Sequence, residues 1–240
     1  MASPALKSWP TETGMVDVDH RLTWSKVSSA LGVLLLALLA TATVGWKLVP
    51  NTATPSIGWI FIPLITAFGV AMWTIRRPQL ARFTGLLYAG LEGLVVGAIS
   101  HVYENARSGV VIEAIGVTLL VLVVCAVLYT SKTVRVTPKF LKVTLAATFG
   151  AVGFYGLCIL ASFLGATPTF LTQAGIGGTV VCLVMATIAS MNFITDLDMI
   201  DRQIEAGADG SFAFYGAFAM LIAAVWLYLE ILRFLAFRRR

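Results

Sequence analysis

Charged residues are scarce in this chain. Only 12% of its 240 residues are Asp, Glu, Lys or Arg, whereas 58% are hydrophobic. A soluble domain carries about 25% charged residues, because water must solvate its surface. The deficit excludes an ordinary soluble fold, and we expect the surplus apolar side chains to face lipid. One spanning helix needs about 20 residues, so the length suits a single compact bundle without a second sizeable domain.

Histidine and cysteine are also rare. The two histidines, His20 and His101, lie far apart, and we expect His101 to be an exposed loop residue. The three cysteines are all within apolar runs and lack the CxxC spacing of zinc sites, so they are interpreted as core residues. GxSxG, HExxH and P-loop motifs are missing. We therefore expect neither an enzyme nor a cofactor.

The net charge of +5 does not indicate a nucleic-acid partner. The 17 Lys and Arg residues are scattered between apolar runs, and they form no basic stripe with interleaved aromatic residues. Such scattering is typical of the flanks of membrane helices. The expected partner is the lipid bilayer.

Seven long apolar runs divide the chain. Each approaches the length that crosses about 30 Å of hydrocarbon, and lipid cannot satisfy an unbonded backbone, so each run is predicted to be a helix. The predicted fold is all-α, a polytopic membrane protein of seven helices. Residues 1–27 form a polar, mostly disordered tail, residues 28–237 the membrane domain and residues 238–240 a basic tail. The runs are Ser28–Val49, Ser56–Ile75, Phe83–Ser100, Gly109–Thr130, Phe140–Leu164, Thr172–Thr195 and Phe212–Phe237.

Basic residues predict the orientation. Eleven of them lie in the tail and around the connections that follow the second, fourth and sixth runs, and six lie on the other side. By the positive-inside rule, the N-terminus is cytoplasmic. The three arginines at the C-terminus oppose this if the seventh helix crosses completely. We expect the inner membrane of a bacterium, because the tail lacks organelle signals.

Closely spaced glycines predict tight helix packing. Gly93 and Gly97 form a GxxxG pair in the third run, and Gly150, Gly153 and Gly156 recur in the fifth. Small residues let helix backbones approach one another in lipid.

Ionisable residues inside the apolar runs are the candidate functional residues, because an unpaired charge is costly there. Glu92 lies midway along the third run without a basic residue within one turn, and Glu113 lies one turn into the fourth. Two acid–base pairs have helical spacing and are expected to bond: Glu230 with Arg233, and Asp198 with Arg202.

Three acids crowd the end of the sixth run: Asp196, Asp198 and Asp201. Close carboxylates repel one another, so the cluster resists full ionisation and can respond to protons. It is also a candidate site for a hard cation such as Ca²⁺, with Asp196 and Asp198 as ligands. Arg76 and Arg77 end the second run on the same predicted side. An Arg–Asp bridge between the two helices is therefore feasible.

Three stretches, in their order and spacing, resemble the Bax inhibitor-1 family, also called the transmembrane Bax-inhibitor-motif family, which has bacterial members. They are residues 100–114, containing Ser-His-Val-Tyr and Gly-Val-Val-Ile-Glu-Ala; residues 193–200, Phe-Ile-Thr-Asp-Leu-Asp-Met-Ile; and residues 227–234, Leu-Tyr-Leu-Glu-Ile-Leu-Arg-Phe. The resemblance covers residues 28–237.

This resemblance implies a seven-helix fold with the seventh helix in the centre, and a pH-sensitive Ca²⁺ leak. In the family, an aspartate at the end of helix six pairs with one in helix seven, and an arginine at the end of helix two latches the former. Asp196 matches the first aspartate, and Arg76 or Arg77 matches the latch. Ala223 occupies the place of the second aspartate, and Glu230, two turns later, is its candidate substitute.

Three functions follow as alternatives. The first is a passive, pH-gated cation leak, with Ca²⁺ as the expected ion. The second is a non-transporting regulator that binds another membrane protein, such as a membrane protease, through the tail and an acidic loop at residues 198–209. The third is a carrier for another small solute, with Glu92 and Glu113 as its intramembrane site.

Overall fold

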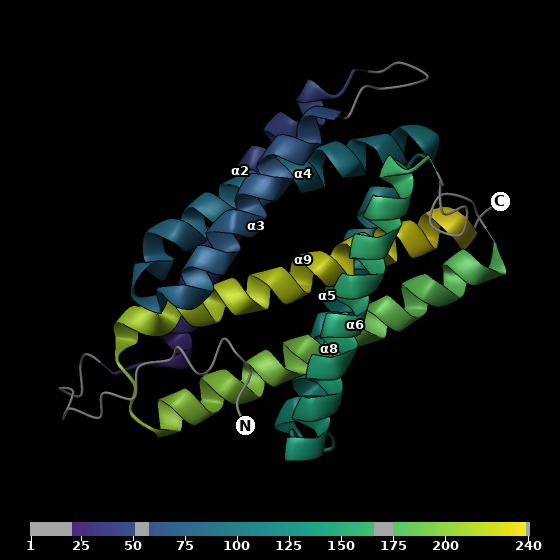
Figure 1. Ribbon diagram of the computed structural model, residues 1–240. Coiled ribbons are helices and arrows are strands. Elements are labelled where there is room, and N and C mark those ends of the chain that lie inside the picture. Colours follow the sequence, from purple (N-terminus) through teal and green to yellow (C-terminus); the bar gives the residue numbers. More distant parts are fainter. Residues whose placement is uncertain (1–20, 51–57, 166–174, 239–240) are drawn as a thin grey trace. The chain divides into compact units, whose positions relative to one another are not determined.

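Seven α-helices make up most of the structure. The computed structural model describes residues 21–50, 58–165 and 175–238, so the first twenty residues of the predicted tail and the last two arginines lie outside these ranges. The all-α prediction is confirmed for the described residues (Figure 1). The helices are α2 (Trp24–Leu48), α3 (Phe61–Arg76), α4 (Ala81–Ala106), α5 (Val110–Thr130), α6 (Pro138–Phe163), α8 (Ile176–Glu205) and α9 (Ala213–Arg238).

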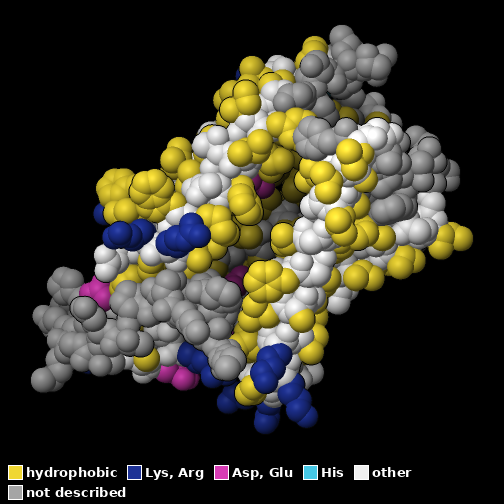
Figure 2. All heavy atoms as spheres, viewed as in Figure 1, with side chains coloured by type: hydrophobic (Ala, Val, Ile, Leu, Met, Phe, Trp, Pro, Cys, Tyr) yellow, Lys and Arg dark blue, Asp and Glu magenta, His cyan; other side chains and the backbone are white. Residues whose placement is uncertain are grey.

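Six of these helices are long and apolar enough to cross a membrane, and α3 is the shorter seventh. A 3₁₀ turn, η2 (Gly58–Ile60), precedes α3 and extends it to a length of about 30 Å. Large apolar side chains are exposed along most of these helices, as lipid contact requires (Figure 2). The chain is therefore an integral membrane protein.

The helices belong to two compact units. One contains α2, α3 and α4 together with residues 196–222, which are the end of α8 and the beginning of α9. The other contains α5, α6, residues 176–195 of α8 and the rest of α9.

In the first unit, α4 packs against both α2 and α3 (Figure 1). A Cβ atom on Gly93 would lie 2.3 Å from the carbonyl oxygen of Leu38, and one on Gly97 would lie 2.0 Å from that of Ala42. The predicted glycine packing is therefore confirmed here. Residue numbers rise together along this contact, so α2 and α4 are parallel. The chain must return between them, and α3 is the helix that makes this crossing.

One end of this unit gathers three connections. The amide of Leu22 donates to the carbonyl oxygen of Ala208 (2.7 Å), and the indole Nε1 of Trp24 donates to Asp201 (2.9 Å). A 3₁₀ turn before α4, η3 (Pro78–Leu80), contacts another before α9, η4 (Gly210–Phe212). The residues before α2, the α3–α4 connection and the α8–α9 connection therefore lie at the same end of this unit. These are three of the four segments predicted to share one membrane face. The fourth, residues 132–139, belongs to the other unit, so its placement on that face stays a prediction.

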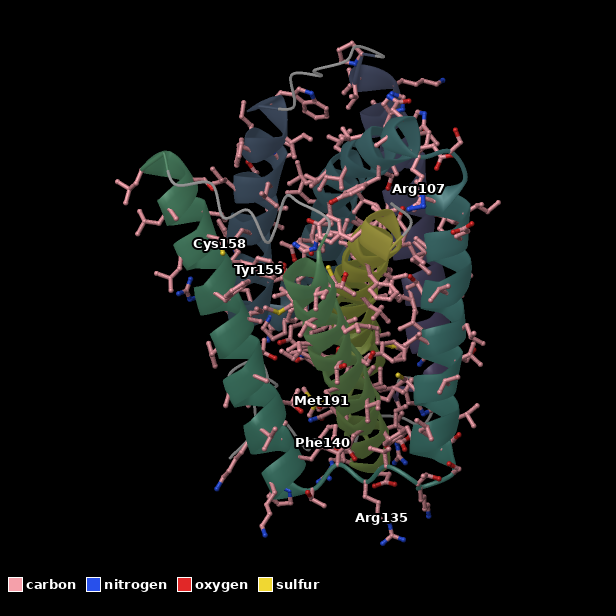
Figure 3. The ribbon with its side chains drawn as sticks, turned by 90° about the vertical axis from the view of Figure 1, so that its right-hand side faces the viewer. Arg107, Arg135, Phe140, Tyr155, Cys158 and Met191 are labelled. Atoms are coloured by element: carbon pink, nitrogen blue, oxygen red, sulfur yellow. The ribbon has the colours of Figure 1, made fainter. Side chains whose placement is uncertain are left out.

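In the second unit, α6, α8 and α9 share an apolar cluster that includes Ala151, Ile188 and Trp226. Arg107 and Arg135 lie at opposite ends of α5 (Figure 3). The guanidinium of Arg107 donates to the carbonyl oxygen of Leu235 (2.6 Å), so the end of α9 lies beside the start of α5.

The three glycines of α6 behave differently from those of α4. Cβ atoms on Gly150, Gly153 or Gly156 would have no described atom within 4 Å, and all three residues are exposed. The prediction that they pack helices of this chain together is wrong for the described residues.

Several predicted helix ends are also wrong. Helix α2 begins at Trp24 rather than Ser28, because the side chain of Thr23 caps it by accepting from the amide of Lys26. Helix α8 continues to Glu205, so the acids predicted for a loop lie on a helix. Helix α4 continues to Ala106 and contains His101, which is buried with its ring 4.9 Å from that of Trp46. His101 is therefore not an exposed loop residue.

Helix α9 is the most enclosed of the candidate spans. In its most apolar stretch 61% of the residues are buried, compared with 56% for the segment Pro78–Ala106 that contains α4. Ala217 and Ala223 on this helix are almost fully buried. The predicted enclosure is confirmed, whereas a position between all six other helices stays a prediction.

Candidate functional site

Asp196 is a carboxylate within an apolar stretch of α8. Its neighbours along the helix, Phe193, Leu197 and Ile200, are buried, and Asp196 itself is half-buried. It makes no hydrogen bond or ion pair with any described residue. Because α8 ends only at Glu205, Asp196 lies about 13 Å inside that end of the helix. The sequence had suggested a position at the rim.

Arg76 and Arg77 end α3, and both side chains are exposed. Within the described residues, neither forms an ion pair or hydrogen bond with Asp196. The structure therefore shows Asp196 unbridged. The bridge predicted between Asp196 and Arg76 or Arg77 is not formed in the described structure, and its role as a switch stays a prediction.

The other acids of the cluster are engaged. Arg202 donates from Nε to Asp198 (2.7 Å), which confirms the predicted pair, and Asp201 accepts from Trp24. The described residues contain no group of three acids, histidines or cysteines placed to hold a metal ion. A Ca²⁺ site at Asp196 and Asp198 would thus have to displace Arg202 and recruit further oxygens.

Glu92 is a second carboxylate without a partner. Its side chain is buried in α4, and it makes no hydrogen bond or ion pair with the described residues. On the helix it shares a stripe with Gly85 and Tyr88. Tyr88 packs edge-on against Phe218 of α9, with ring centroids 5.1 Å apart. Glu92 therefore lies on the face of α4 that contacts α9.

Asp196 and Glu92 flank the same part of α9. Ile200, one turn from Asp196, packs on Gly216, where an added Cβ would lie 3.1 Å from the side chain of Ile200. Gly216 and Phe218 are two positions apart, which is about 200° around a helix. The stripes that carry the two acids therefore meet α9 on opposite sides.

The second unit contains a different acid–arginine cluster. Glu230 is buried in α9 and forms the predicted ion pair with Arg233. Tyr155 of α6 donates its hydroxyl to Glu230 (2.5 Å) and accepts a hydrogen bond from Arg233. The guanidinium carbon also lies 5.4 Å from the centroid of the tyrosine ring. These contacts join α6 and α9 through a polar network, in which Arg233 Nε is buried without a hydrogen-bond partner among the described residues.

The remaining positions predicted from the sequence have surroundings that fit a structural role. Ala223, at the place of the expected helix-seven aspartate, is buried and cannot ionise. Glu113 lies half-buried in the first turn of α5, where the helix dipole favours an acid. Glu230 keeps two strong partners, so in this arrangement it is a bonded structural carboxylate.

A family model described as Bax inhibitor 1 like matches residues 3–240, which is almost the whole chain. The chain belongs to this family. A search of the curated proteins found no match. The Bax inhibitor 1 like assignment agrees with the resemblance in the sequence, and with the spanning helices described above.

In this Bax inhibitor 1 like chain, Tyr155 is the residue that sequence reasoning missed. It lies in an apolar run and is 75 positions from Glu230, so nothing local marks it as a partner. One signal existed: a buried carboxylate with a single basic neighbour requires another donor. It predicts that Glu230 has a second hydrogen-bond donor, but it does not predict which helix provides that donor.

Proposed function

We propose that this membrane protein is a pH-sensitive passive leak for cations, chiefly Ca²⁺, and that the charge of Asp196 sets its open fraction. The observation that carries the proposal is the unpartnered Asp196 carboxylate within an apolar stretch of a spanning helix. Intramembrane carboxylates of this kind mark ion and proton paths. Membership in the Bax inhibitor 1 like family supports the same reading. We place the protein in a bacterial inner membrane with its N-terminus in the cytoplasm.

Protons and cations compete at Asp196 in this proposal. The neutral carboxyl group is compatible with the packing described, because it needs no counter-charge. The ionised group requires water, a cation or a guanidinium. Arg76 or Arg77 supplies that guanidinium in a second conformation, since neither is bonded to Asp196 in the described one. Bidentate bonding by arginine then stabilises the second state.

Glu92 contributes from the other side of α9. Ionising either acid favours hydration of its flank and therefore weakens the packing of α9 there. Between residues 213 and 222, α9 has no acidic or basic side chain, and on Glu92's own helix the nearest titratable group is Tyr88, one turn away. The two carboxylates thus act on one helix segment from opposite faces.

The test is Ca²⁺ flux into proteoliposomes at a series of pH values. Asp196→Asn mimics the protonated acid, so its flux should lose most of its pH dependence and keep only the part that Glu92 contributes. Asp201→Asn is the matched control, because the amide oxygen can still accept the hydrogen bond from Trp24. Absence of flux at every pH, or equal behaviour of the two variants, would refute the proposal.

A second candidate function is a non-transporting regulator that binds another membrane protein. The exposed glycines of α6 favour it, because Gly150, Gly153 and Gly156 leave open a face on which a foreign helix can approach closely. Co-purification from native membranes distinguishes the two. A stoichiometric partner that is lost in Gly153→Leu, together with absent flux, would favour the regulator.

A further inference from the structure

Four basic side chains surround the turn between α5 and α6. Lys132 and Arg135 lie in the turn, and Lys139 and Lys142 lie in the first turns of α6. All four are exposed, and none makes a side-chain hydrogen bond or ion pair with a described residue. Arg135 projects from the end of the helices, as Figure 3 shows. The turn therefore presents a concentrated positive charge to its surroundings.

No acid of this part of the chain balances that charge. The sequence has neither Asp nor Glu between Glu113 and Asp196. Arg202, by contrast, bonds Asp198 on its own helix. The four basic residues of the turn have no such acidic neighbour in their own stretch of sequence, a feature that they share with Arg76, Arg77 and Arg82 of the α3–α4 connection.

The charges do not serve the local fold. Lys139 and Lys142 follow the start of α6, where the helix dipole disfavours positive charge. Backbone bonds hold the turn, including that from Val134 N to the carbonyl oxygen of Leu128 (3.1 Å), and the hydroxyl of Thr137 caps α6. An external anion is therefore the compensating partner that these side chains lack.

We propose that the α5–α6 turn binds the phosphate headgroups of anionic phospholipids. The turn joins two spanning helices, and the exposed Val143 next to Lys142 indicates where the apolar surface begins. This depth places the four cations at the level of lipid phosphates. Arginine can bond two phosphate oxygens at once, and lysine adds point charges. The site is separate from Asp196 and does not depend on the proposed leak.

The test uses the full chain reconstituted in mixed phosphatidylglycerol and phosphatidylcholine vesicles. Spin-labelled lipids of each kind report their relative association with the protein. A charge near an anionic surface contributes up to about fivefold in affinity, so Arg135→Gln should lower the phosphatidylglycerol preference about two- to fivefold. Replacing all four residues by Gln should abolish it, whereas Lys139→Arg with Lys142→Arg should keep it.

Arg202→Gln is the matched control, because it removes an exposed arginine that already has an acidic partner. Its lipid preference should equal that of the unmodified protein. Equal effects of Arg135→Gln and Arg202→Gln would overturn the proposal. Displacement of the labelled lipid by inorganic phosphate at constant ionic strength would assign the site to free phosphate instead, and would also overturn it.

Discussion

Tyr155→Phe tests the polar network that joins α6 to α9. The substitution removes one hydroxyl, which donates to Glu230 and accepts from Arg233, and keeps the ring. Hydrogen bonds to charged groups contribute about 1.5–3 kcal/mol each in soluble proteins, and at most about 1.7 kcal/mol in a membrane interior. Membrane values average about 0.6 kcal/mol per bond, so two such bonds predict a loss of about 1–3 kcal/mol in the free energy of unfolding.

Reversible unfolding in mixed micelles measures this loss. Tyr88→Phe is the control, because Tyr88 is also buried against an aromatic ring, but its hydroxyl has no hydrogen bond to a described residue. We expect a change below about 0.5 kcal/mol there. A double-mutant cycle with Glu230→Gln should show coupling of about 1–2 kcal/mol. A loss for Tyr155→Phe no larger than that for Tyr88→Phe would refute the network.

Two further predictions concern helix packing and topology. Gly97→Ala should lower the free energy of unfolding by about 1–3 kcal/mol, because its Cβ would meet a backbone carbonyl that cannot move aside. Gly150→Ala, at an open position, should raise it by about 0.5–1 kcal/mol, and a loss there would contradict the described exposure. In intact cells, an impermeant thiol reagent should label a cysteine placed at Ser108 and miss one placed at Arg135, since these positions lie at opposite ends of α5. The native cysteines are buried, so labelling at both positions would contradict the topology.

The positions of the helices could be predicted from the sequence, because burial in lipid requires long apolar runs. Their ends could not, because polar residues continue a helix when tertiary contacts favour it. Asp201 extends α8 as the acceptor for Trp24, and His101 extends α4 against the ring of Trp46. Both tryptophans belong to α2, and no local sequence pattern near Asp201 or His101 predicts these contacts.

The sequence identified which residues belong to the candidate site, but it did not identify most of their contacts. Asp196 and Glu92 were chosen because each is a carboxylate in an apolar run, and the structure leaves both without described partners. The pair Glu230–Arg233 followed from helical spacing and is confirmed. Glycine spacing failed to separate Gly97, which is pressed against α2, from Gly153, which is open. The same spacing of glycines occurs in both helices, and whether a glycine is packed depends on the presence of a neighbouring helix.

The stretch without acids has a consequence for how the protein can sense its environment. From Ala114 to Thr195 there is no Asp, Glu or His, and the ordinary titration ranges of Cys, Tyr, Lys and Arg lie above neutral pH. This third of the chain therefore contains none of the side-chain types that ordinarily gain a proton below neutral pH. Any response to acidification must arise in residues 1–113 or 196–240. Helix α6, and α5 beyond Glu113, can transmit such a signal, but the side chains of these segments cannot generate it.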